Sequence, residues 1–191
     1  MQEPITIIRK AFFLALQKQT QAESSQDLHR KRSHFWVKSL AKQFRDHYEK
    51  DNSVRVFSKD YSKNRKDFLL NELLYDVCVC RVDKVVSKQK KELYYIKDVL
   101  WQVESEFAKN SRQALVDFNK LVLGTAKNKL FIGPQVHDTQ SFIEVLRSPA
   151  AACSGSVYLC LLPHPSDWDP ENSFPIHLWS FSTDHWQQYR E

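Results

Sequence analysis

Three carboxylates stand on two apolar segments that the sequence predicts as neighbouring strands. Asp76 interrupts the apolar run 73–82, and Glu104 and Glu106 lie within the segment 101–107. Because successive side chains of a strand point to opposite faces, Glu104 and Glu106 share one face, and a hairpin would bring Asp76 opposite them. Carboxylate oxygens are the ligands that Mg²⁺ and Mn²⁺ prefer, and they suit zinc poorly. We therefore predict a Mg²⁺ (or Mn²⁺) site formed by Asp76, Glu104 and Glu106.

A divalent metal ion held by these carboxylates would act on phosphate esters. It can polarise a phosphodiester, lower the pKa of a bound water molecule and stabilise the charge that grows on the departing oxygen. Two carboxylates side by side on a buried strand also repel each other, so a cation is expected near them.

Glu72 shares a strand face with Asp76 and is an accessory candidate. Glu23 is either a further acid of the site or a solvated or capping residue.

An alternative interpretation treats the three acids as ordinary surface carboxylates that pair with lysines on a half-exposed sheet. The apolar neighbours of Asp76 argue against it, because Asp is a poor strand former and its presence there needs a reason. A degenerate site that has lost its metal stays open as a third interpretation.

The positive charge is concentrated in one segment. The chain of 191 residues carries 28 Lys and Arg against 23 Asp and Glu, a net charge of +5. Residues 26–66 hold twelve of these basic residues and five of the acidic ones, whereas residues 134–191 hold two and seven. This polarity is typical of a protein that contacts a polyanion, although a solvated lysine-rich helix would give the same count. We expect DNA phosphates to contact Lys31, Lys38, Lys42, Lys59, Lys63, Arg65 and Lys66.

The elements that would position these residues follow from hydrophobic spacing. Helices are predicted over residues 5–21, 27–50 and 138–146, and over a segment that begins after Asn110, whose side chain and Gln113 resemble a capping box. Strands are predicted over residues 54–57, 75–82, 93–107, 129–133, 156–162 and 176–181, with a lysine-rich turn at 84–91. The fold class is α/β, with a central mixed sheet flanked by helices. We expect a single domain, 1–191, divided into an N-terminal helix (1–25), a core (26–133) and an acidic, aromatic-rich extension of the sheet (134–191).

These residues and elements resemble the PD-(D/E)XK superfamily of restriction-endonuclease-like nucleases. The resembling residues are Asp76 at the end of LLYD, Glu104-Ser-Glu106 one hairpin later, and a helix containing DFNKL that is followed by KLFIG. The resemblance covers residues 26–133, in the family's order of helix, antiparallel strands, helix and strand. It implies a restriction-endonuclease-like core, metal ligation by Asp76 and Glu104, and a Mg²⁺-dependent DNA endonuclease.

The sequence departs from the family pattern at Glu106, which stands where the family usually has lysine. Glu106 could complete the metal shell or activate the attacking water, and a lysine could come from elsewhere, with Lys120 and Lys109 as candidates. The alternative is a catalytically inactive protein of the nuclease fold that acts as a DNA-binding or protein-interaction subunit.

Other classes of protein are disfavoured by what the sequence lacks. It has no glycine-rich phosphate loop and no Gly-x-Ser-x-Gly element, so nucleotide and serine hydrolases are not indicated. An RNA-binding module would show interleaved aromatic and lysine residues, which are absent outside the aromatic tail. The four cysteines lack metal-type spacing and the chain lacks an apolar run of membrane length, so we expect a cytoplasmic protein without a membrane segment. A homodimer is expected, because cutting both strands of a duplex often needs a twofold partner.

Overall fold

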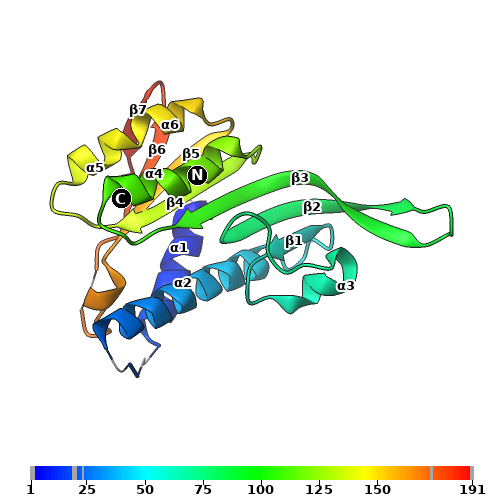
Figure 1. Ribbon diagram of the computed structural model, residues 1–191, viewed down its shortest axis with the longest axis horizontal. Coiled ribbons are helices and arrows are strands. Elements are labelled where there is room, and N and C mark those ends of the chain that lie inside the picture. Colours follow the sequence, from blue (N-terminus) through cyan, green and yellow to red (C-terminus); the bar gives the residue numbers. More distant parts are fainter. Residues whose placement is uncertain (1–2, 19–20, 23, 173, 190–191) are drawn as a thin grey trace.

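A seven-stranded mixed sheet forms the centre of the molecule (Figure 1). The computed structural model describes residues 3–18, 21–22, 24–172 and 174–189. The strands lie side by side in chain order, β1 to β7, and their bounds are Val54–Phe57, Val77–Val86, Glu92–Ser105, Asn128–Pro134, Ser156–Leu162, His177–Ser182 and His185–Gln188. β3, β4 and β5 are parallel to one another, and the other neighbours are antiparallel. The α/β class with a mixed central sheet is therefore confirmed.

Helices cover both faces of the sheet (Figure 1). The long helices α1 (Glu3–Leu16) and α2 (Ser25–His47) bury Ile8, Trp36 and Phe44 against one face. Against the other face, α4 (Ser111–Leu123), α5 (Thr139–Val145) and α6 (Arg147–Ala152) bury side chains that include Phe118 and Phe142. Two apolar cores, one on each face, therefore hold the three layers together.

The helix α2 begins and ends close to its predicted bounds, whereas α1 ends earlier than predicted. In α2 the Ser24 hydroxyl accepts a hydrogen bond from the backbone N–H of Asp27 (3.2 Å), so the helix starts at Ser25. In α1 the helix ends at Leu16, earlier than predicted, and the N–H of Lys18 reaches back to the carbonyl of Ala15 (3.3 Å). The segment after β1, for which no helix was predicted, contains a 3-10 turn (Ser62–Asn64) and the single helical turn α3 (Arg65–Phe68).

The β2–β3 hairpin differs from its prediction at both ends. The turn is shorter than expected, because Val85 and Val86 continue β2 and pair with Leu93 and Glu92. At the other end β2 begins at Val77, so Asp76 precedes the strand and the prediction that it lies within one was wrong. The carboxylate of Asp76 accepts a hydrogen bond from the backbone N–H of Ser105 on β3. This side-chain bond replaces a backbone hydrogen bond through which β2 could otherwise have continued along β3.

The parallel connection from β3 to β4 runs through α4, and that from β4 to β5 runs through α5 and α6. This arrangement brings the carboxyl ends of β3, β4 and β5 to the same edge of the sheet.

The helix α6, the strand β7 and a 3-10 turn (Pro165–Asp167) were not predicted. None of the helices described is both long and apolar enough to cross a membrane.

Candidate active site

The three predicted acids come together at the carboxyl end of β3. Glu104 is the penultimate residue of that strand, and the N–H of Glu106 continues the ladder to the carbonyl of Ile132 on β4 (2.9 Å). Asp76 lies beside them because Val77 pairs with Val103, and its Oδ2 is 2.9 Å from the N of Ser105. The hairpin pairing that the sequence suggested therefore brings Asp76 to the two glutamates.

Glu104 is the most enclosed acid of the group, with only 2% of its surface exposed. Its Oε2 accepts a hydrogen bond from Nζ of Lys120 at 3.0 Å, whereas its Oε1 is buried without a hydrogen-bond partner among the described residues. Burial, and then the nearby charge of Asp76, raise the pKa of Glu104 to about 8. One oxygen of a buried carboxylate is thus available to a second cation.

Lys120 comes from α4, one turn after Asp117, and both side chains point to the end of β3. Its Nζ lies 2.7 Å from Oδ1 of Asp117 and 3.0 Å from Oε2 of Glu104. Burial alone would lower the pKa of Lys120, but the hydrogen bonds to Asp117 and Glu104 hold it above its ordinary value. A permanently charged ammonium group therefore stands beside Glu104.

Glu106 and Asp117 form a second pair, in which two carboxyl groups share a hydrogen bond. Burial raises the pKa of Glu106, and its Oε1 accepts the N–H of Ala108 at 2.6 Å. Burial would also raise the pKa of Asp117, but hydrogen bonds from Lys120, Glu106 and Gln113 outweigh it and lower that pKa. Two carboxyl groups in contact cannot both be ionised cheaply, so the contact with Asp117 favours the protonated form of Glu106.

Asp76 lines a hollow of about 340 Å³ between α2 and the segments on either side of α3. Burial raises the pKa of Asp76, while the N–H of Ser105 and the charge of Lys120 oppose that rise. Lys38 and Lys59 also line this hollow, and neither has an ion-pair partner among the described residues. Glu72, the accessory candidate, lies there too and its charge adds to the rise in the pKa of Asp76. The hollow therefore joins an acid of the predicted site to two lysines, and Asp60 and Glu72 line it as well.

Two observations bear on a metal ion, and they point in opposite directions. In the described part of the chain, no three His, Cys, Asp or Glu side chains are gathered closely enough to hold a metal. The Oε1 of Glu104 has no hydrogen-bond partner among the described residues. Burial first, and then the neighbouring carboxylates, raise the pKa values of Asp76, Glu104 and Glu106, and a bound cation would favour their charged forms. The donor set is made of hard oxygen ligands and fits Mg²⁺ or Mn²⁺. The residues fit a metal chemically, although their side chains are not pre-arranged as a cage.

The other basic residues predicted to bind DNA fall into two groups. Lys63, Arg65 and Lys66 have no ion-pair partner in the described structure. By contrast, Lys31 pairs with Asp27 (2.6 Å) and Lys42 with Asp46 (2.5 Å), one turn away on α2. The paired lysines present less net charge to a ligand than the unpaired ones.

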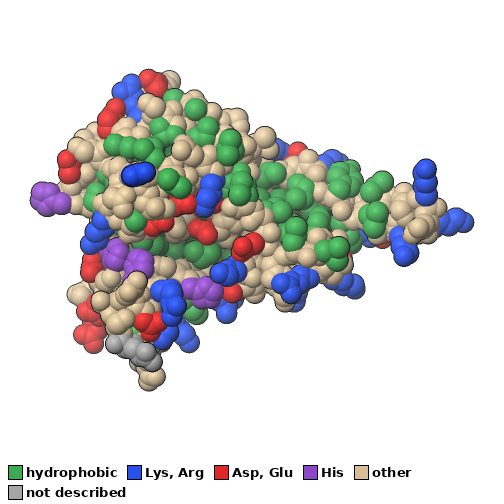
Figure 2. Space-filling model, in the orientation of Figure 1, with side chains coloured by type: hydrophobic (Ala, Val, Ile, Leu, Met, Phe, Trp, Pro, Cys, Tyr) green, Lys and Arg blue, Asp and Glu red, His purple; other side chains and the backbone are tan. Residues whose placement is uncertain are grey.

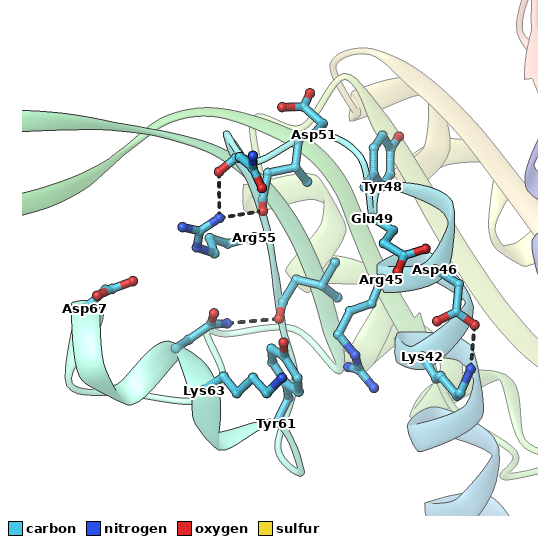
Figure 3. Close-up of a pocket in the computed structure, with 14 residues that line it drawn as sticks. Lys42, Arg45, Asp46, Tyr48, Glu49, Asp51, Arg55, Tyr61, Lys63 and Asp67 are labelled. Atoms are coloured by element: carbon cyan, nitrogen blue, oxygen red, sulfur yellow. Dashed lines mark hydrogen bonds and ion pairs between the residues drawn. The ribbon is translucent and has the colours of Figure 1, made fainter.

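A larger hollow of about 640 Å³ lies between the carboxyl end of α2, β1 and α3 (Figure 3). The guanidinium group of Arg45 lies over the ring of Tyr61 there, 4.2 Å from its centroid, and Arg55 donates to backbone carbonyls. Basic and acidic side chains line it in equal numbers, so their charges cancel. This hollow does not contain the predicted acids, and we do not assign it as the active site.

Sequence reasoning missed Asp117 as a member of the site. The available signal was its helical spacing, because residues three apart on a helix share a face and Lys120 was already a candidate. Of the two candidate lysines, the structure brings Lys120 to the acids, whereas the charge of Lys109 acts on His164. Glu23 lies outside the described residues.

Comparisons with known proteins give no relative for this chain. No protein-family model, no curated protein and no solved structure matches it.

Proposed function

We propose that this protein is a Mg²⁺- or Mn²⁺-dependent DNA endonuclease of the restriction-endonuclease-like class. The observation that carries the proposal is the position of Lys120, whose Nζ lies 3.0 Å from Oε2 of Glu104. In the resembling family a lysine stands two residues after that acid, where this chain has Glu106. A lysine from α4 therefore reaches Glu104, whose own strand carries no lysine at the family's position.

The order of the elements supports the same class. α2 is followed by the antiparallel strands β1, β2 and β3, then by α4 and the parallel strand β4. The family shares this order of helix, antiparallel strands, helix and strand. The acids stand at the ends of strands beside the crossover helix, where a rigid scaffold holds them.

Asp76 and Glu104 would hold the metal ion, which supplies a bound water of lowered pKa and stabilises charge on the phosphate. Lys120 stays protonated beside Glu104 and would add positive charge next to the reacting phosphate. The contact with Asp117 favours the protonated form of Glu106. With a cation held by Asp76 and Glu104, the ionised form of Glu106 would be favoured and its proton would pass to solvent. The carboxylate of Glu106 could then bind the metal or accept a proton from water.

The substrate would enter through the hollow that Asp76 shares with Lys38 and Lys59. Their ammonium groups would contact backbone phosphates on either side of the bond that is cut. Lys63, Arg65 and Lys66 on the neighbouring segment would extend this contact. A second copy of the chain would cut the opposite strand, so we propose a homodimer on DNA.

The proposal is tested by incubating supercoiled plasmid with the protein in Mg²⁺, in Mn²⁺ and in EDTA. We expect nicked and linear DNA in the presence of either metal and intact plasmid in EDTA. Glu104→Gln should abolish cleavage, and Asp98→Asn, which changes another acid of the same strand, should not. Intact plasmid in both metals would overturn the proposal.

A second candidate is a protein of the nuclease fold that binds DNA without cutting it. The observation that favours it is the lack of a pre-arranged three-ligand site among the described residues. Gel-shift and calorimetry experiments separate the two candidates. Tight DNA binding together with no Mn²⁺ binding and no cleavage would favour the inactive subunit.

A further inference from the structure

The β2–β3 hairpin extends well beyond the body of the molecule as a two-stranded arm (Figure 1). We call residues 84–96 the β2–β3 arm. Apart from Tyr94, which approaches Phe68, and the turn residue Ser87, the side chains of the arm are exposed. A two-stranded ribbon is marginally stable in water on its own, so an ordered arm of this length needs local stabilisation.

Local contacts stabilise the arm up to its tip. Lys84 forms an ion pair with Glu92 across the strands (2.6 Å) and lies over the ring of Tyr94, 5.1 Å from its centroid. The turn is closed by hydrogen bonds from the N–H of Ser87 to the carbonyl of Lys91 (2.9 Å) and from the N–H of Lys91 to Oγ of Ser87 (3.1 Å). The backbone of the tip is therefore a defined turn, and the lysine side chains that it carries are exposed.

The tip carries positive charge that nothing in the described structure balances. Lys88, Lys90 and Lys91 are exposed and have no ion-pair partner there, whereas Lys84 and Lys97 pair with Glu92 and Asp83. Lysine side chains at the end of the arm are visible in Figure 2. Three like charges within four residues repel one another, so an anionic partner would relieve a cost that the free protein bears.

The arm also exposes apolar side chains directly behind this charged tip. Val85 and Leu93 face each other across the strands and are 52% and 50% exposed, and Val86 is 66% exposed. An apolar surface next to a cluster of lysines fits a ligand that offers both phosphates and base edges. The major groove of DNA is wide enough to admit a two-stranded ribbon and exposes the methyl group of thymine.

We propose that the β2–β3 arm binds duplex DNA, with Lys88, Lys90 and Lys91 on backbone phosphates and the ribbon in the major groove. The inference takes DNA as the ligand from the proposed function, but it does not require that the DNA is cut. Twelve residues separate Glu92 from Glu104, which corresponds to roughly 40 Å of strand. At 3.4 Å for each base pair, the arm would contact DNA about 12 base pairs from the acids, or roughly one helical turn away.

The test compares Lys88→Gln/Lys90→Gln/Lys91→Gln with the wild type by fluorescence anisotropy in EDTA, so that binding is measured without cleavage. On a 30-base-pair duplex we expect the triple variant to bind roughly tenfold more weakly, with the slope of log K against log salt reduced by about 3. On a 10-base-pair duplex, which cannot span both contacts, the loss should be much smaller. The matched control for the single variant Lys91→Gln is Lys10→Gln, which changes an exposed lysine on α1. The Lys10→Gln variant should bind DNA as the wild type does.

Unchanged affinity and salt slope of the triple variant on the long duplex would overturn the proposal. A loss confined to single-stranded DNA would also overturn it, as would a loss of equal size on both duplexes. If Val85→Thr/Leu93→Thr dissociated a dimer in sedimentation while DNA binding was unchanged, the arm would be a contact between two copies instead. If DNA binding depends on the arm but the protein cuts no DNA, this inference stands and the proposed nuclease activity is rejected.

Discussion

The ammonium group of Lys120 lies 3.0 Å from Oε2 of Glu104, although sixteen residues separate them in the chain. The contact joins the crossover helix α4 to the end of β3. Asp117 holds the same ammonium group from the other side at 2.7 Å, which fixes its direction. Glu104, Lys120 and Asp117 are therefore coupled, and replacing one of them should change the hydrogen bonding and the pKa of the other two.

Replacement of Lys120 should reduce cleavage more than it reduces stability. Lys120→Met removes the positive charge beside Glu104, so we expect the cleavage rate to fall by about 10²–10³-fold, as is typical when a group that stabilises transition-state charge is lost. Single-turnover plasmid nicking in Mn²⁺ measures the rate. Lys109→Met is the matched control, because that exposed lysine does not contact the acids. Equal rates for the two variants would contradict a role for Lys120.

Without metal, the protein should become less stable as the pH rises from about 4.5 to 8. The pKa of Glu104 is raised to about 8, so in this range the folded state binds a proton that the unfolded state has released. The stability lost across the window is up to about 5 kcal/mol for this group. Urea denaturation at several pH values in EDTA measures the slope. Glu104→Gln should flatten it, and a variant with the wild-type slope would contradict the raised pKa.

Mn²⁺ should stabilise the folded protein, because it binds the acids in the folded state and relieves their repulsion. At a metal concentration a hundred times the dissociation constant, the gain is about 2.7 kcal/mol. Differential scanning fluorimetry at pH 7.5 with and without Mn²⁺ measures it as a rise in Tm. Asp76→Asn and Glu104→Gln should lose the rise, whereas Asp98→Asn, remote from the site, should keep it. A rise of the same size in Asp76→Asn would place the metal elsewhere.

Trp36 connects the core beneath α2 to the site. Its indole N–H donates to Oγ of Ser105 at 3.0 Å, and the N–H of Ser105 in turn donates to Asp76 at 2.9 Å. We expect Trp36→Phe to cost about 1–2 kcal/mol of the free energy of unfolding, because a buried hydrogen bond is lost while most of the apolar contact remains. Chemical denaturation measures the change, and a cost below about 0.5 kcal/mol would show that the hydrogen bond contributes little.

Much of the fold could be predicted from the sequence, because the hydrophobic spacing is strong in the long elements. The spacing of Trp36, Leu40 and Phe44 predicted α2, and the apolar segments at 54–57 and 156–162 correspond to β1 and β5. The helix α6 was not predicted because its sequence, RSPAAA, is short and contains a proline. The strand β7 was not predicted because it has only four residues. Short elements depend on the neighbours that they pack against, which local sequence does not encode.

The site was predictable in part, for a related reason. Hairpin pairing predicted that Asp76 lies beside this end of β3, and the charge of Asp76 acts on both Glu104 and Glu106. That Glu104 and Glu106 share a face stays a prediction, because Glu106 lies just beyond the end of β3. The contact between Lys120 and Glu104 depends on where α4 crosses the sheet, and no spacing rule gives that position. The hydrogen bond between Glu106 and Asp117 depends on the same crossing.

The most direct test of the central claim moves the lysine from α4 back to the strand. Lys120→Met should reduce plasmid cleavage in Mn²⁺ by about 10²–10³-fold. Glu106→Lys added to Lys120→Met should restore part of the lost cleavage, because it places a lysine at the family's position while it removes the carboxyl group of Glu106. The control is Glu92→Lys added to Lys120→Met, which places a lysine elsewhere on β3 and should leave cleavage at the reduced level. Full cleavage by Lys120→Met, or no recovery of cleavage in the double variant with Glu106→Lys while its fold and Mn²⁺ binding are intact, would contradict the assigned role of Lys120.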